Sequence, residues 1–188
     1  MNITYLPAIY DAIQWLLAGN VSEYFAKYIS LLKGQRVLDA CCGTGLAADM
    51  IGTNYFGFDI NFRYLKMNAK KYDRKKIFFQ MDATAWSIYP ASFDSAVMVC
   101  AAHHFPDEAL HNLFSNIIQS ISGRFVFIDI VTVTNPFVKI LHRLDVGKYI
   151  RSVEENLSLL RSHFELAAHE VFFADRRLYK YLYVDCRR

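Results

Sequence analysis

The sequence lacks any charge-free apolar run long enough to cross a membrane, although 54% of its 188 residues are hydrophobic. It also lacks repeats and low-complexity tracts, and its length is that of one domain with a substantial core. The N-terminus has no basic leader, and Asp11 interrupts its apolar pattern, which argues against a signal peptide. We therefore expect a single domain over residues 1–188, with no membrane span and a cytoplasmic location.

Cysteine and net charge are also scarce. Two of the four cysteines form the adjacent pair Cys41-Cys42, which resembles neither a disulfide framework nor a set of spaced metal ligands. This usage indicates a reducing compartment, and no metal site is predicted. The formal net charge of +3 is too small to argue for a nucleic-acid partner by itself.

What the sequence does contain is a glycine turn between a short apolar run and a helical pattern. Residues 37–45 read Val-Leu-Asp-Ala-Cys-Cys-Gly-Thr-Gly. Such a turn brings backbone N–H groups and a helix N-terminus close to a ligand. A glycine turn alone is weak evidence, because many strand–helix units contain one.

Three successive apolar runs each end at an acidic residue. Asp39 ends the first run, Asp59 follows residues 55–58, and Asp82 follows residues 77–81. In an open parallel sheet the carboxyl ends of the strands share one edge, where ligands bind. Three acids on that edge beside a glycine turn predict a nucleotide-like site.

Each acid also has a purely structural interpretation. Asp39 can cap the turn, Asp59 can cap the next helix together with Asn61, and Asp82 can cap the segment that begins at Ala83. Taken singly, these alternatives remain open. The coincidence at the same end of three consecutive strands favours the functional interpretation.

Strand and helix patterns alternate along the chain, which predicts an α/β fold with a mostly parallel sheet. Apolar residues at helical spacing before Leu32 predict an N-terminal helical cap over residues 1–32. Strands are expected at residues 36–38, 55–58, 77–81, 93–99 and 125–133. One helix is expected after the first strand, ending near residue 51, and another over residues 62–71. A third is expected along the apolar stripe Leu110, Leu113, Phe114, Ile117, Ile118 and Ile121. An irregular insert over 134–152 follows the fifth strand.

The C-terminal part predicts a helix and a hairpin. Ser152 and Glu155 form a plausible capping box for a helix that ends near His163. Two strand-like runs, 164–173 and 178–184, are separated by a short link and are therefore antiparallel. The expected fold is a Rossmann-like seven-stranded, mostly parallel sheet with helices on both faces and a C-terminal antiparallel hairpin, its last strand inserted against the others.

With these motifs the chain resembles a class I S-adenosylmethionine (SAM)-dependent methyltransferase. Within that family it is most similar to small-molecule enzymes of the ubiquinone/menaquinone-biosynthesis type. Residues 39–45 match the family's acid–Gly–Gly–Gly turn, except that Cys41 replaces the first glycine. The resemblance implies SAM as cofactor, SAH as product, and a small-molecule acceptor rather than nucleic acid.

The resemblance also implies a set of cofactor-binding residues. Asp59 matches the acid that binds the ribose hydroxyls, while Asp82 and Ala83 match the pair beside the adenine. A glycine turn allows the backbone to approach the methionine end closely. The fourth-strand motif, residues 93–105, ends near the methionine part and the acceptor. The expected cofactor-binding residues are Asp39, Cys41, Gly43, Gly45, Asp59, Ile60, Asp82, Ala83 and Cys100.

Catalytic and acceptor-binding residues are predicted less directly. His103 and His104 follow the fourth strand, where a histidine can accept a proton from the acceptor; the alternative is that they pack or hydrogen-bond a loop. Tyr10 belongs to an N-terminal aromatic cluster that either covers the acceptor or forms core. Arg151 either meets substrate or forms an ion pair with Asp145 that orders the insert.

Other functional classes remain possible. Residues 43–48 also satisfy the G-x-G-x-x-A dinucleotide fingerprint, which leaves a small NAD(P)-dependent oxidoreductase as an alternative. The Tyr-x-x-x-Lys spacing of Tyr72 and Lys76 lies at the opposite edge of the sheet. A non-catalytic SAM-binding protein fits the same motifs. A nucleic-acid methyltransferase is disfavoured, because the Asn/Asp-Pro-Pro-aromatic motif is missing. The acceptor and the oligomeric state stay open.

Overall fold

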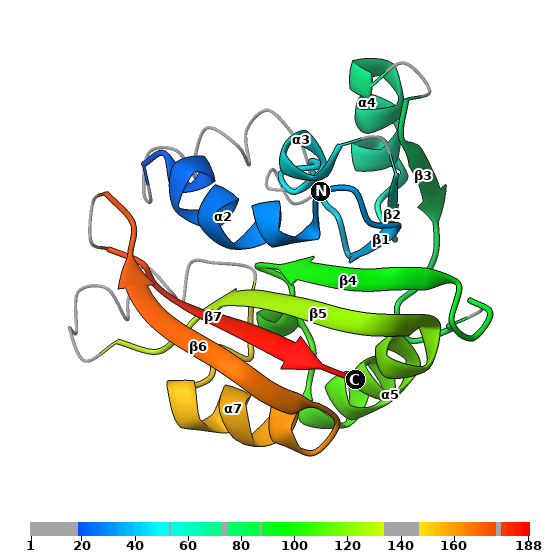
Figure 1. Cartoon of the computed structure of the whole chain (residues 1–188). Helices are drawn as coiled ribbons and strands as arrows, with labels where there is room; N and C mark the ends of the chain where they lie inside the picture. The colour runs from blue at the N-terminus through cyan, green and yellow to red at the C-terminus, as the bar shows by residue number, and fades with distance from the viewer. Residues whose placement is uncertain (1–18, 53, 73–74, 87, 134–146, 176–177) are drawn as a thin grey trace.

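The computed structural model describes residues 19–52, 54–72, 75–86, 88–133, 147–175 and 178–188. Seven strands form one sheet in the order β3-β2-β1-β4-β5-β7-β6 (Figure 1). The strands are β1 (Val37–Ala40), β2 (Tyr55–Asp59), β3 (Ile77–Gln80), β4 (Phe93–Val99), β5 (Ile121–Ile130), β6 (Glu165–Phe173) and β7 (Lys180–Arg187). Strands β1 to β5 are parallel, whereas β7 lies antiparallel between β5 and β6.

Helices cover both faces of the sheet (Figure 1). One face is covered by α2 (Val21–Ile29), α3 (Ala48–Ile51) and α4 (Phe62–Tyr72), whose apolar residues share a core with the sheet. The other face is covered by α5 (Asp107–Ser120) and α7 (Val153–Arg161), which pack on a second core cluster. Two short 3-10 turns, Ser30–Leu32 and Ala102–His104, follow α2 and β4.

The predicted architecture is confirmed, including the insertion of the last strand between β5 and β6. The predicted capping box is also confirmed at the start of α7. The Glu155 N–H donates to the Ser152 hydroxyl at 3.2 Å, and the Ser152 N–H donates to the Glu155 carboxylate at 2.7 Å. All four cysteines are free thiols. No helix within the described part of the chain is both long and apolar enough to span a bilayer.

Both limits predicted for the fifth strand, residues 125–133, were wrong, because β5 spans Ile121–Ile130. Strand β5 begins at Ile121, which the helical stripe had placed in the preceding helix, because Ile121 is fully buried and pairs with Phe93. The ladder shifts register just after this pair, and Ser122-Gly123, which resembles a turn, lies inside the strand. Helix α3 ends at Ile51 as predicted, but it is only one turn long, because the loop after β1 continues to Ala47.

The start of α2 is tied to the C-terminal hairpin. The Asn20 N–H and the Tyr24 hydroxyl donate to the Asp175 carboxylate at 3.1 and 2.7 Å. These bonds fix residues 19–22 beside the sheet edge that carries the site. The rest of the predicted cap, residues 1–18, and residues 134–146 of the predicted insert lie outside the described residues.

Candidate functional site

A cavity of about 540 Å³ opens at the carboxyl edge of the parallel strands. Its walls come from the segments that follow β1, β2, β3 and β4, as the alternation of strands and helices predicts. Of the predicted site residues, the cavity brings together Asp39, Cys41, Gly43, Asp59, Ile60, Asp82, Ala83, Cys100 and His104. Gly45, His103 and Arg151 do not line it, and Tyr10 lies outside the described residues.

The turn after β1 has the backbone conformation of a glycine loop. Gly43 has φ +50°, and a Cβ added there would meet no protein atom within 4 Å. Cys41, which stands where the family has glycine, itself adopts φ +60°. A left-handed φ costs a non-glycine residue roughly 1–2 kcal/mol. The turn therefore keeps the glycine conformation at Cys41 and leaves open space above Gly43.

Asp59 connects this turn to the start of α4. Its Oδ2 accepts the Gly43 N–H at 2.9 Å, and its Oδ1 accepts the Asn61 N–H at 2.8 Å. The predicted structural role beside Asn61 is thus present. Each carboxylate oxygen has a second lone pair, so the group can still accept hydroxyl protons from a ligand. Burial raises the pKa of Asp59, while the backbone donors of Asn61, Gly43 and Ile60 oppose the rise.

Asp82 differs from Asp59 because it is exposed. Its Oδ1 accepts the Thr84 N–H at 2.8 Å and the Thr84 hydroxyl at 2.7 Å. These bonds hold the pKa of Asp82 below its ordinary value. Asp82 therefore presents an ionised acceptor at the cavity, beside the buried Ala83.

Asp39 is the most perturbed acid of the site. It is 2% exposed and accepts the Tyr55 hydroxyl at 2.5 Å. Burial raises its pKa to about 7; the Tyr55 hydrogen bond opposes this rise, and the charge of Asp59 adds to it. A buried carboxyl that binds a proton near neutrality is typical of a ligand site.

This perturbation predicts how stability depends on pH. The folded protein holds the Asp39 proton more tightly than the unfolded chain does. The protonated Asp39 therefore contributes fully to the free energy of unfolding below about pH 4, and this contribution is lost as the pH rises through about 7. We expect Asp39→Asn, which keeps an acceptor for Tyr55, to raise the free energy of unfolding by about 2–3 kcal/mol near pH 8. Near pH 4.5 the gain should be much smaller. Urea unfolding at both pH values measures the difference, and an equal gain at the two would contradict the assignment.

Helix α4 supports the glycine turn through two residues that the sequence analysis missed. The fully buried Asn68 donates its Nδ2 to the Gly43 carbonyl at 2.9 Å. The Tyr72 hydroxyl lies 3.1 Å from the Gly45 carbonyl and 2.9 Å from the Asp49 carboxylate. Their signal in the sequence is that Leu65, Asn68 and Tyr72 share one helical face, which places a polar amide at a buried position.

Gly45 is needed for a different reason than ligand approach. Its φ is +81°, and an added Cβ would lie 2.9 Å from the Asn68 Oδ1. Gly45 therefore allows α4 to pack closely against the turn. The structure thus gives Gly45 a packing role, and its contact with a cofactor stays a prediction.

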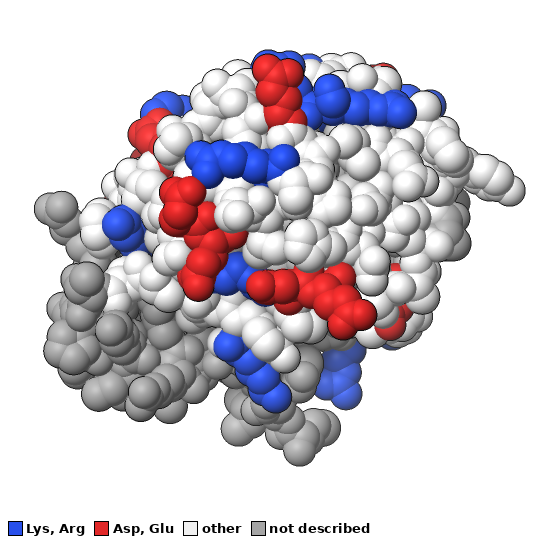
Figure 2. Space-filling view, turned by 90° about the horizontal axis from the view of Figure 1, so that it is seen from below, with Lys and Arg blue, Asp and Glu red and all other residues white. Residues whose placement is uncertain are grey.

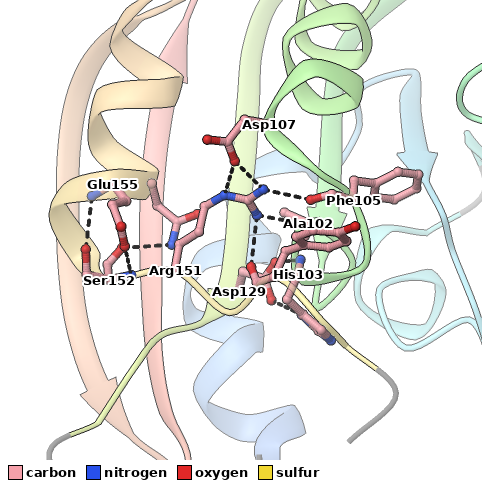
Figure 3. A network of polar contacts seen from close by, with 10 residues as sticks. Ala102, His103, Phe105, Asp107, Asp129, Arg151, Ser152 and Glu155 are labelled. Atoms are coloured by element: carbon pink, nitrogen blue, oxygen red, sulfur yellow. Dashed lines mark hydrogen bonds and ion pairs between the residues drawn. The ribbon is translucent and has the colours of Figure 1, made fainter. Parts of the chain in front are cut away.

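The two histidines after β4 occupy different places. His104 is exposed and lines the cavity. His103 is buried, and its N–H and its ring Nδ1 contact the Asp129 carboxylate at 2.9 and 2.5 Å (Figure 3). A Cβ on Gly147 would lie only 2.1 Å from the His103 ring. His103 thus hydrogen-bonds and packs against the surrounding loops, which is the structural alternative given above. The prediction of a catalytic base therefore rests on His104.

Arg151 binds the loops that follow β4 and precede α7 (Figure 3). Its guanidinium donates to the Asp107 Oδ1 at 2.8 and 2.6 Å. It also donates to the carbonyls of Ala102, Tyr149 and Phe105 at 3.2, 3.0 and 2.7 Å. The ion pair predicted for Arg151 exists, but its partner is Asp107, and Asp145 lies outside the described residues. Because Arg151 is buried away from the cavity lining, the predicted contact with substrate is not supported.

Part of the cavity lining was not predicted from the sequence. It consists of residues Gly19, Asn20, Val21, Ser22 and Phe25 around the start of α2, together with Phe105 and Tyr181. The apolar side chains among them make the cavity suited to a ligand with an apolar part.

Residues 37–122 match a family model described as a methyltransferase domain. That segment includes β1 to β4, all of α5 and the first residues of β5, with the glycine turn and all three acids. This part of the chain is therefore similar to a methyltransferase domain, in agreement with the resemblance found in the sequence. No curated protein matches the chain.

Solved structures share the fold of this chain. A SAM-dependent methyltransferase from Archaeoglobus fulgidus is 17% identical with a TM-score of 0.76, over 95% of this chain and 99% of that one. Geranyl diphosphate C-methyltransferase from Streptomyces coelicolor, in complex with Mg²⁺, geranyl diphosphate and S-adenosyl-L-homocysteine, is 14% identical with a TM-score of 0.73, over 88% and 77%. Magnesium protoporphyrin IX methyltransferase from Synechocystis, with bound SAH, is 16% identical with a TM-score of 0.68, over 89% and 82%.

Proposed function

We propose that this single-domain enzyme transfers a methyl group from SAM to a small, apolar or aromatic acceptor in the cytoplasm. The observation that carries the proposal is one cavity lined by the glycine turn, the three strand-end acids and several apolar side chains. The match of residues 37–122 to a methyltransferase domain supports the reaction class. The resemblance to ubiquinone/menaquinone-type enzymes supports the acceptor class and stays a prediction.

The residues around the cavity fit SAM. Asp59 retains lone pairs for the ribose hydroxyls, and the ionised Asp82 can accept from the adenine amino group, with Ile60 and Ala83 beside it. The open space above Gly43 suits the methionine end, next to Cys41 and Cys100. The ionised Asp82 adds negative charge, which complements a sulfonium cation. SAM would supply the electrophilic methyl group, while the chain binds, orients and excludes water.

Other side chains of the cavity lining can hold the acceptor and accept its proton. Val21, Phe25 and Phe105 can bury an apolar ring, and Tyr181 adds a polar edge. His104 is the titratable ring of the post-β4 loop at the cavity, so we assign it the role of accepting a proton from an acceptor hydroxyl or amine. Holding the acceptor at near-attack distance in a water-poor cavity supplies much of the rate.

The oxidoreductase alternative has less support. Its Tyr72 is engaged with Gly45 and Asp49, and Lys76 lies over the rings of Tyr55 and Tyr72. Neither residue lines the cavity. The fingerprint glycine Gly45 contacts Asn68 instead of open space. A non-catalytic SAM-binding protein has the same cavity, and a turnover assay on candidate acceptors separates it.

Calorimetry with SAM, SAH and NAD tests the cofactor assignment. We expect SAM and SAH to bind and NAD not to bind. Asp59→Ala should weaken SAM binding by about 1.5–3 kcal/mol, because it removes charge-assisted hydrogen bonds and the anchor of Gly43. Asp94→Ala is the matched control, since Asp94 accepts the Arg36 N–H at 2.7 Å but lies outside the cavity lining. Unchanged SAM affinity in a folded Asp59→Ala protein would refute the ribose assignment.

A further inference from the structure

Although the net charge of the chain is small, one segment is strongly basic. Residues 62–76 hold seven of the chain's 21 Lys and Arg residues and only one of its 18 Asp and Glu residues. The remainder, with 14 basic and 17 acidic residues, is net acidic. Charge concentrated in one segment indicates a partner of opposite sign far better than net charge does.

Three of these basic residues lie on the outer face of α4. Arg63, Lys66 and Lys70 are exposed and recur at helical spacing, and α4 contains no acidic residue. Among the described residues none of the three forms an ion pair, in contrast to Lys71, which pairs with Asp49 at 2.7 Å. Because unpaired cations on one face add their fields, this face attracts anions.

Large apolar side chains adjoin the same face at the rim of the cavity. Phe62, in the first turn of α4, is 61% exposed, and Ile60, two residues earlier, is 64% exposed. Ile60 also lines the cavity. The basic face and the cavity mouth are therefore continuous through these two residues.

The opposite side of the molecule has a different surface. Helices α5 and α7 lie across the sheet from α4 (Figure 1). Figure 2, which views that side from below, shows acidic groups interspersed with basic ones. Arg161 there is paired with Glu154 at 2.8 Å. The side with α5 and α7 is thus mixed in charge, whereas the α4 face carries basic and exposed apolar side chains.

We propose that α4, with Ile60 and Phe62, docks the protein on an anionic phospholipid bilayer. Lysine and arginine near such a surface each strengthen binding about fivefold, and apolar side chains between them enter the interface. Phe62 could stack on a nucleobase but Ile60 could not, whereas both can enter a lipid interface, so the pair favours lipid over nucleic acid. Docking in this way turns the cavity mouth toward the bilayer. The inference rests on the proposed function only in giving an apolar acceptor a route into the cavity.

Vesicle sedimentation with the full chain tests the docking surface. The vesicles are pure phosphatidylcholine, or phosphatidylcholine with one-third phosphatidylglycerol. We expect binding to the anionic vesicles alone, which weakens as salt rises from about 50 to 500 mM. The triple variant Arg63→Gln/Lys66→Gln/Lys70→Gln should bind about a hundredfold more weakly. The control Lys33→Gln/Lys148→Gln/Arg161→Gln removes three exposed cations elsewhere and should lose less than about fivefold.

Further measurements separate the alternatives. Phe62→Ser should weaken vesicle binding severalfold without changing its salt dependence. SAM affinity should be unchanged in the α4 triple variant, whose residues lie outside the cavity lining, so failure of docking and failure of the cofactor assignment are distinguishable. Equal binding to both vesicle types, or equal losses in the α4 and control variants, would overturn the proposal. Tight, α4-dependent binding of tRNA or duplex DNA without vesicle binding would also overturn it.

Discussion

Gly43→Val should abolish SAM binding while the protein still folds. An added side chain at Gly43 meets no protein atom within 4 Å, so it projects into the cavity where the methionine end of SAM is proposed to lie. The Gly43 N–H is held by Asp59 and its carbonyl by Asn68, which prevents the turn from moving aside. Calorimetry with SAM and SAH should show a loss of affinity beyond about a hundredfold.

A control glycine distinguishes the effect of backbone strain from the effect of a blocked cofactor site. Gly34 also has a left-handed φ, +81°, with nothing within 4 Å of an added Cβ, but it does not line the cavity. Gly34→Val should therefore lower the melting temperature to a similar extent and keep full SAM affinity. If Gly43→Val bound SAM within about threefold of the parent protein, the methionine end would have to lie elsewhere.

The residues of the sheet edge could be predicted because their position follows from topology. Once three strands are parallel, the acids at their carboxyl ends must share one edge, and Asp39, Asp59 and Asp82 all line the cavity. The capping box at Ser152 could be predicted because it depends on residues only three positions apart. Local spacing and strand order were sufficient for these features.

Features that depend on tertiary partners could not be predicted in the same way. The reason that position 45 is glycine is the Asn68 side chain on a helix more than twenty residues later. The burial of His103 depends on Asp129 and on the close approach of Gly147. Ile121 fits the helical stripe of α5 by spacing, and only its pairing with Phe93 places it in a strand. Sequence periodicity contains no information on such distant contacts.

Arg151→Met should cause a large loss of stability. Its guanidinium is 7% exposed and supplies donors to the carbonyls of Ala102, Tyr149 and Phe105, which have to converge after β4 and before α7. Methionine fills most of the volume but leaves these carbonyls without that donor, at a cost of about 3–4 kcal/mol in total. Thermal unfolding should then shift down by about 8–12 °C.

Asp107→Asn distinguishes the carbonyl contacts from the ion pair. The Asp107 side chain is 69% exposed, so water screens its charge, and the substitution should cost less than about 1 kcal/mol. Arg151→Lys should lie between the two, because one ammonium cannot reach all the acceptors of a planar guanidinium. If Asp107→Asn destabilised the protein as much as Arg151→Met, the exposed ion pair would be the main interaction. If the larger loss is confined to Arg151→Met, Arg151 fixes the loop that carries His104 and Phe105 into the cavity. Folded Arg151→Lys protein should then retain SAM affinity, while its rate of methyl transfer falls.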